Sequence, residues 1–156
     1  MASSSYPHVA GILLIKIRQR RMVESKKVLV IEDDEDIRFI ISLILKDAGF
    51  EVIESESLEI ISRLATIQPN FILMDNSLKD GSGSEMCKKL KTDPATSHFP
   101  IIIISAATDL LAITKQCLAD GFIEKPFDLS DFVSRLEDLR CFNTETVNGT
   151  GEQIFH

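Results

Sequence analysis

Short apolar or alternating segments, typical of strands, are each followed by a segment whose apolar residues recur at helical spacing. This succession occurs five times. The strand-like segments are Val28–Ile31, Glu51–Glu54, Phe71–Met74, Ile101–Ile104 and Phe122–Glu124. The helical patterns cover residues 37–45, 58–65, 84–91, 109–119 and 129–139. Five strand–helix units predict a doubly wound α/β fold, in which a five-stranded parallel sheet carries helices on both faces.

The two ends of the chain differ from this pattern. Six basic residues and one acidic residue lie among residues 1–27, whereas the rest of the chain holds eleven basic and 23 acidic residues. We expect a basic, poorly ordered extension at residues 1–24, one domain at 25–142 and a flexible polar tail at 143–156. An alternative for the extension is a weak amphipathic anchor or targeting arm.

Composition excludes several classes of protein. The net charge of −7 argues against nucleic-acid binding by the domain surface. No apolar run approaches the roughly 18 residues of a membrane-spanning helix. Cys87, Cys117 and Cys141 are widely spaced and form no metal-binding motif. We interpret them as reduced cysteines that pack as small apolar side chains. Such cysteines are typical of a reducing compartment, so we expect a cytoplasmic protein.

Polar residues follow four of the five predicted strands. Glu32 and Asp33 follow the first strand, Asp75 the third, Ser105 the fourth, and Lys125 the fifth. Each has an ordinary explanation by itself: acids near a helix N-terminus, a turn, a capping hydroxyl, or a charge at a sheet edge. In parallel sheets, however, the carboxyl ends of the strands share one edge, where ligands bind. Together the residues predict a phosphoryl-transfer site, in which clustered carboxylates hold a hard cation such as Mg²⁺.

These segments resemble the response-regulator receiver domain of two-component and phosphorelay signalling, of the chemotaxis-regulator type. The resemblance covers about residues 25–141 and implies a flavodoxin-like fold with strand order 2-1-3-4-5. The matching stretches are VLVIEDDEDIR (28–38), FILMDNSLKDGSG (71–83), PIIIISAA (100–107) and GFIEKPF (121–127).

The resemblance also implies roles for the residues of the site. Asp75 is the expected phosphoacceptor, and Glu32 and Asp33 are the acidic pair that binds Mg²⁺. Asp75 itself and the backbone carbonyl of Ser77 complete the expected protein ligands. Lys125 is expected to contact the phosphoryl group.

A conformational switch and its partners are implied as well. Ser105 is the expected switch hydroxyl, Phe122 the aromatic switch, and Pro126 follows a cis peptide bond. The expected phosphodonor is a sensor histidine kinase or a histidine phosphotransfer protein. The expected output surface comprises the helix at 109–119, the strand at 122–124 and the helix at 129–139, and it binds a downstream protein or a second copy.

Three positions depart from the usual family pattern. Glu32 replaces a more usual Asp, Lys79 stands where Pro is common, and Phe122 lacks the hydroxyl of the commoner Tyr. Two alternatives to this interpretation are a receiver that serves as a docking or dimerisation module without phosphorylation, and a haloacid-dehalogenase-like phosphatase. The 15 residues after Cys141 are too few for an effector domain, which indicates a stand-alone regulator or part of a longer chain.

Overall fold

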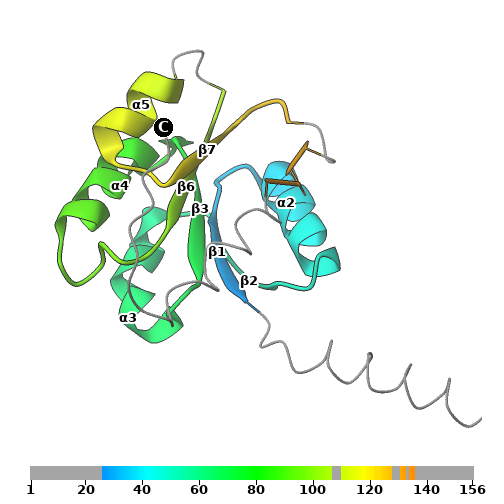
Figure 1. Cartoon of the computed structure of the whole chain (residues 1–156). Helices are drawn as coiled ribbons and strands as arrows, with labels where there is room; N and C mark the ends of the chain where they lie inside the picture. Colours follow the sequence, from blue (N-terminus) through cyan, green and yellow to red (C-terminus); the bar gives the residue numbers. More distant parts are fainter. Residues whose placement is uncertain (1–25, 107–109, 128–130, 133, 136–156) are drawn as a thin grey trace, which may run out of the picture.

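Five parallel strands form the central sheet of the computed structural model (Figure 1). The strands are β1 (Lys27–Ile31), β2 (Glu51–Ser55), β3 (Phe71–Asp75), β6 (Ile101–Ser105) and β7 (Gly121–Glu124). They lie in the order β2-β1-β3-β6-β7. This order is the 2-1-3-4-5 arrangement of parallel strands, so the predicted fold is confirmed.

The structure describes residues 26–106, 110–127, 131–132 and 134–135. The expected N-terminal extension at 1–24 and tail at 143–156 lie outside the described residues, as do Cys141 and most of the helix expected at 129–139. None of the helices in the described part of the chain has the length and apolar content needed to cross a membrane.

Helices cover both faces of the sheet, as Figure 1 shows. α2 (Glu35–Asp47) lies on one side. The opposite side carries the 3₁₀ helix η1 (Leu58–Arg63), α3 (Leu64–Ile67), α4 (Gly83–Thr92) and α5 (Leu110–Cys117). Alternate residues of β1, β3 and β6 therefore enter two separate apolar cores, one under α2 and one under the other helices. This double burial explains why β1, β3 and β6 read as continuous apolar runs.

The ends of α2 follow directly from the sequence. The Asp34 side chain accepts a hydrogen bond from the Ile37 N–H at 3.0 Å and caps the helix N-terminus. Gly49 follows the helix with a φ of 87°, a backbone conformation that favours glycine. Asp34 is thus the ordinary capping acid that an acidic run before a helix suggests.

Two local features differ from the sequence prediction. The helix expected at 58–65 is a 3₁₀ helix followed by one α-helical turn that ends at Ile67. The loop after β3 contains an unexpected two-residue antiparallel pair, β4 (Ser77–Leu78) with β5 (Gly81–Ser82).

Cys87 and Cys117 are free and buried, and burial raises the pKa of the Cys87 thiol.

Candidate functional site

The register of the sheet brings the predicted site residues to one edge. Ile31 of β1 lies opposite Met74 of β3, so the following residues, Glu32 and Asp75, lie at the same level. Asp75 in turn lies opposite Ile104 of β6, and Ser105 is the last residue of that strand. The site is therefore built where β1 and β3 diverge toward helices on opposite faces, as expected at a topological switch point.

Three carboxylates meet at this edge. Glu32, Asp33 and Asp75 each offer an oxygen that lies within 4.8 Å of the other two. Glu32 and Asp75 are buried, with exposed fractions of 2% and 4%, while Asp33 is half-buried. Three like charges this close repel one another, and a bound cation relieves that repulsion.

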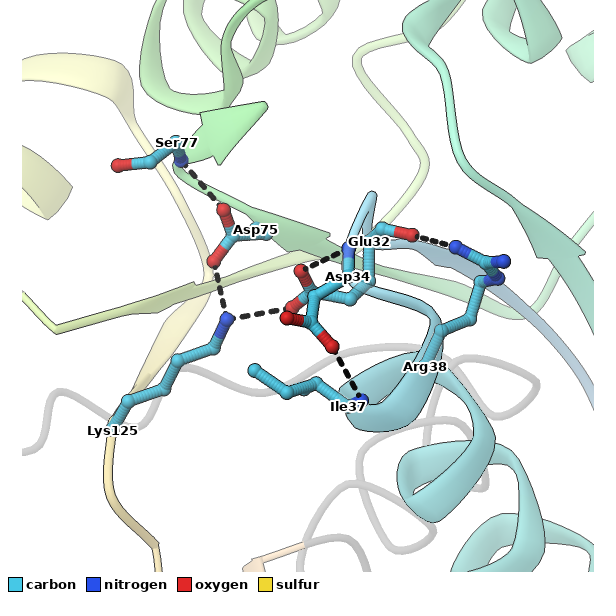
Figure 2. Close-up of polar contacts among 7 residues, drawn as sticks. All are labelled: Glu32, Asp34, Ile37, Arg38, Asp75, Ser77 and Lys125. Atoms are coloured by element: carbon cyan, nitrogen blue, oxygen red, sulfur yellow. Dashed lines mark hydrogen bonds and ion pairs between the residues drawn. The ribbon is translucent and has the colours of Figure 1, made fainter. Parts of the chain in front are cut away.

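Lys125 supplies a positive charge to two of these carboxylates (Figure 2). Its Nζ donates to Glu32 Oε2 at 2.6 Å and to Asp75 Oδ1 at 2.8 Å. The Lys125 backbone N–H donates to the Ser105 carbonyl at 2.9 Å, which fixes the start of the segment that follows β7. The peptide bond between Lys125 and Pro126 is cis.

The pKa values of the ionised groups reflect this burial and pairing. Burial raises the pKa of Glu32 above its ordinary value, the Lys125 hydrogen bond opposes the shift, and the negative charge of Asp75 reinforces it. Burial by itself lowers the pKa of Lys125, but the hydrogen bonds to Asp75 and Glu32 outweigh burial and raise that pKa. The ammonium is therefore held in its charged form between two carboxylates.

The second oxygen of Asp75 bonds to the loop that follows β3. Asp75 Oδ2 accepts from the Ser77 backbone N–H at 2.7 Å (Figure 2). The Ser84 backbone N–H donates to Asn76 Oδ1 at 3.0 Å, which ties the first turn of α4 to the same loop. Both carboxylate oxygens of Asp75 thus have fixed donors, and its orientation is determined.

Contacts around Glu32 include residues that the sequence interpretation did not assign to the site. The Arg38 guanidinium donates to the Glu32 backbone carbonyl at 2.6 Å, and the Asp34 backbone N–H donates to Glu32 Oε1 at 3.2 Å (Figure 2). Arg38 lies six residues after Glu32 on α2, and no motif pointed to this contact. These bonds hold the turn between β1 and α2 against the site.

The two expected switch residues occupy neighbouring strands. Ser105 is buried at the end of β6, with an exposed fraction of 2%. Phe122 is half-buried on β7 and lies opposite Ile103, two positions before Ser105. The structure therefore places Ser105 at the edge that carries the carboxylates and Phe122 further back along the sheet.

The chemistry of the donor set suits a hard divalent cation. All three clustered side chains, those of Glu32, Asp33 and Asp75, offer carboxylate oxygens. Mg²⁺ and Ca²⁺ prefer oxygen ligands, whereas soft metals prefer sulfur or imidazole. The residues present thus fit the predicted Mg²⁺.

Comparison with known proteins identifies the family. The protein-family model for the response regulator receiver domain matches residues 28–137 of the chain. The chain therefore belongs to the receiver domains of response regulators, which are signalling switches of two-component systems. This result favours the receiver interpretation over the haloacid-dehalogenase alternative.

Curated relatives contain this domain within longer proteins. The phosphate regulon transcriptional regulatory proteins PhoB of Pseudomonas aeruginosa and Escherichia coli are 34% and 29% identical to the chain. Each alignment covers 72% of this chain, but only 50% and 51% of those proteins. A histidine kinase of Formosa agariphila is 29% identical over 74% of this chain and 9% of its own length. The chain thus spans at most about half of these relatives.

Solved structures of other proteins share the fold of this chain. A putative response regulator from Chloroflexus aurantiacus superposes with a TM-score of 0.69 at 25% identity, covering 76% of this chain and 99% of that one. The chemotaxis response regulator CheY4 of Vibrio cholerae superposes with a TM-score of 0.67 at 24% identity, covering 74% and 98%. The similarity thus extends over nearly the whole length of these two single-domain structures.

Proposed function

We propose that this receiver domain accepts a phosphoryl group on Asp75 from a phosphohistidine of a sensor histidine kinase or histidine phosphotransfer protein. The supporting observation is the position of the Lys125 ammonium, which contacts both Asp75 and Glu32 beside the Asp33 carboxylate. This arrangement combines a nucleophilic carboxylate, a fixed cation and an acidic metal-binding cluster.

Mg²⁺ is the proposed cofactor. The carboxylates of Glu32, Asp33 and Asp75 and the backbone carbonyl of Ser77 would hold it. When bound, it offsets negative charge on the transferring phosphoryl oxygens. Glu32 is one methylene longer than aspartate, and its carboxylate already reaches Lys125 and the Asp34 N–H. Contact between Glu32 and the ion through a water is therefore compatible with these bonds.

In the proposed step, a carboxylate oxygen of Asp75 attacks the phosphorus of the phosphohistidine. The phosphorus–nitrogen bond breaks, its electron pair returns to the imidazole, and an acyl phosphate forms on Asp75. Lys125 is positioned to exchange its bond to Asp75 for one to a phosphoryl oxygen. The Ser77 backbone N–H orients the carboxylate through Oδ2.

The proposed output depends on Ser105 and Phe122. A phosphoryl group on Asp75 would offer new acceptor oxygens near the end of β6, and the Ser105 hydroxyl would donate to one of them. Movement of Ser105 would bias the position of Phe122 on the adjacent strand. The surface over α5, β7 and the helical residues that follow would then bind a downstream protein or a second copy.

The direct test is incubation with Mg²⁺ and acetyl phosphate, followed by intact-mass measurement. We expect the mass of one phosphoryl group to be gained by the wild type and not by Asp75→Asn. Omission of Mg²⁺ should also prevent the gain. Absence of a gain with acetyl phosphate and with a phosphorylated histidine phosphotransfer protein would instead support the non-phosphorylated docking module.

A further inference from the structure

Lys79 forms a second ion pair at the carboxylate cluster. Its Nζ lies 3.6 Å from Asp33 Oδ2. The Lys79 side chain is 82% exposed, whereas the Asp33 side chain is 15% exposed. The Lys79 ammonium therefore approaches the cluster from the solvent side, whereas the Lys125 side chain is mostly buried.

The backbone on both sides of Lys79 is anchored. Leu78 is buried in the core that α4 and α5 cover, with an exposed fraction of 8%. On the other side, Asp80 Oδ2 accepts from Ser57 Oγ at 2.9 Å and from the Leu58 N–H at 2.7 Å. These bonds attach the β4–β5 turn to the N-terminus of η1. The position from which Lys79 reaches Asp33 is thus set by its two neighbours.

The two lysines together give every carboxylate of the cluster a cationic partner. Lys125 pairs with Glu32 and Asp75, and Lys79 pairs with Asp33. A divalent cation held by Asp33 would approach the same carboxylate as the Lys79 ammonium, and like charges repel. Lys79 can turn into water when this happens, because its side chain is already largely exposed.

We propose that Lys79 is a built-in competitor of the divalent cation: it neutralises Asp33 in the metal-free protein and thereby weakens Mg²⁺ binding. This inference rests on the proposed role of Asp33 as a metal ligand. Lys79 is a positioning residue in this scheme, since it acts on the metal through Asp33. Exposed ion pairs are weak, so the effect is a tuning of affinity by a small factor.

Calorimetric titration with Mg²⁺ tests the proposal without any phosphodonor. We expect Lys79→Met to bind Mg²⁺ about 1.5- to 5-fold more tightly than the wild type. Lys79→Arg keeps the charge and should bind like the wild type. Lys88→Met is the matched control, because it removes one exposed lysine from α4 and the same unit of net charge. The advantage of Lys79→Met should shrink at high salt, because salt screens exposed pairs.

Two results would overturn the role of Lys79 while leaving the metal site intact. One is equal Mg²⁺ affinity in the wild type and Lys79→Met, and the other is an equal gain in Lys88→Met. A wild type that shows neither heat of Mg²⁺ binding nor a Mg²⁺-dependent thermal shift would overturn the metal site itself, and the Lys79 proposal with it. Urea unfolding in EDTA verifies that Lys79→Met is folded.

Discussion

Gly83 packs its backbone directly against the main chain of Asp75. A Cβ atom on Gly83 would overlap the Asp75 carbonyl oxygen and would lie only 3.0 Å from the carbonyl carbon. The Gly83 N–H donates to the Asn76 carbonyl at 3.0 Å. The first turn of α4 therefore closes onto the strand that carries the proposed phosphoacceptor, and only glycine fits at this contact.

Replacement of Gly83 by alanine should shift the main chain of Asp75. We expect Gly83→Ala to lower the free energy of unfolding by about 1–3 kcal/mol, as for overpacked sites, and to slow phosphorylation by acetyl phosphate. Gly121→Ala is the matched control, since its Cβ would make an ordinary 3.6 Å contact with Ile102 Cγ1. Urea unfolding of both variants provides the measurement, and equal losses would contradict the specific role of Gly83.

Leu118 has an unfavourable backbone conformation after α5. Its φ is 60°, in the left-handed region, and its side chain is 53% exposed. Glycine adopts this conformation without the steric cost that a Cβ imposes, so Leu118→Gly should raise the free energy of unfolding by about 0.5–1 kcal/mol. Leu118→Ala separates the effect of the backbone conformation from the effect of the exposed leucine side chain, because it removes the rest of the side chain but keeps the Cβ. A gain of stability in Leu118→Ala equal to that in Leu118→Gly would show that the backbone is not the source.

The surface pair between Lys46 and Glu54 predicts a pH dependence. The two side chains meet at 2.8 Å, and the hydrogen bond from Lys46 lowers the pKa of Glu54 below its ordinary 4.5. A lowered carboxyl pKa stabilises the folded state above the unfolded pKa, and this contribution is lost as pH falls through the folded pKa. At pH 7 and low salt, Glu54→Gln should therefore be less stable than the wild type by about 0.2–1 kcal/mol.

The difference should disappear below the folded pKa of Glu54, where the wild-type carboxyl is also neutral. Glu56→Gln removes the same charge from an exposed position and serves as the control. Thermal unfolding from pH 2.5 to 7 checks the prediction. A difference that grows toward acid pH would show that the sign is wrong.

The sheet and most of the site could be predicted because they depend on short-range patterns and one general rule. Apolar runs of strand length, separated by helical patterns, determine a parallel sheet, and the rule that strand ends share one edge assembles Glu32, Asp75, Ser105 and Lys125. The capping role of Asp34 and the turn at Gly49 are equally local. The fold and the proximity of these residues could therefore be predicted without knowledge of tertiary contacts.

Contacts that depend on register or on loop conformation were not predictable in the same way. The bond from Arg38 to the Glu32 carbonyl requires the exact angle between β1 and α2. The anchoring of Asp80 on η1 joins residues 22 positions apart and depends on how the β4–β5 pair folds. The close approach of Gly83 to Asp75 depends on where α4 begins. Nothing in local sequence distinguishes these partners from other polar residues or glycines in loops.

Lys125 has a structural contribution that a divalent cation should partly replace. Its side chain is 17% exposed and is bonded to two carboxylates whose side chains are 2% and 6% exposed. Removal of one partner of a buried ion pair leaves uncompensated charge, so Lys125→Met should lower the free energy of unfolding by about 3 kcal/mol in EDTA. Mg²⁺ at the proposed site would attract the same carboxylates, and it stabilises the folded state by mass action.

We therefore expect Mg²⁺ to recover more stability in Lys125→Met than in the wild type. Urea unfolding of both proteins, with EDTA and with saturating Mg²⁺, gives the four values needed. Lys91→Met is the comparison variant: Lys91 is paired with Asp120 at 2.7 Å and bonds the Ser97 and Phe99 carbonyls, away from the carboxylate cluster. Its loss of stability should be independent of Mg²⁺. An identical response of the two lysine variants to Mg²⁺ would mean that the ion does not act at the carboxylates that Lys125 holds.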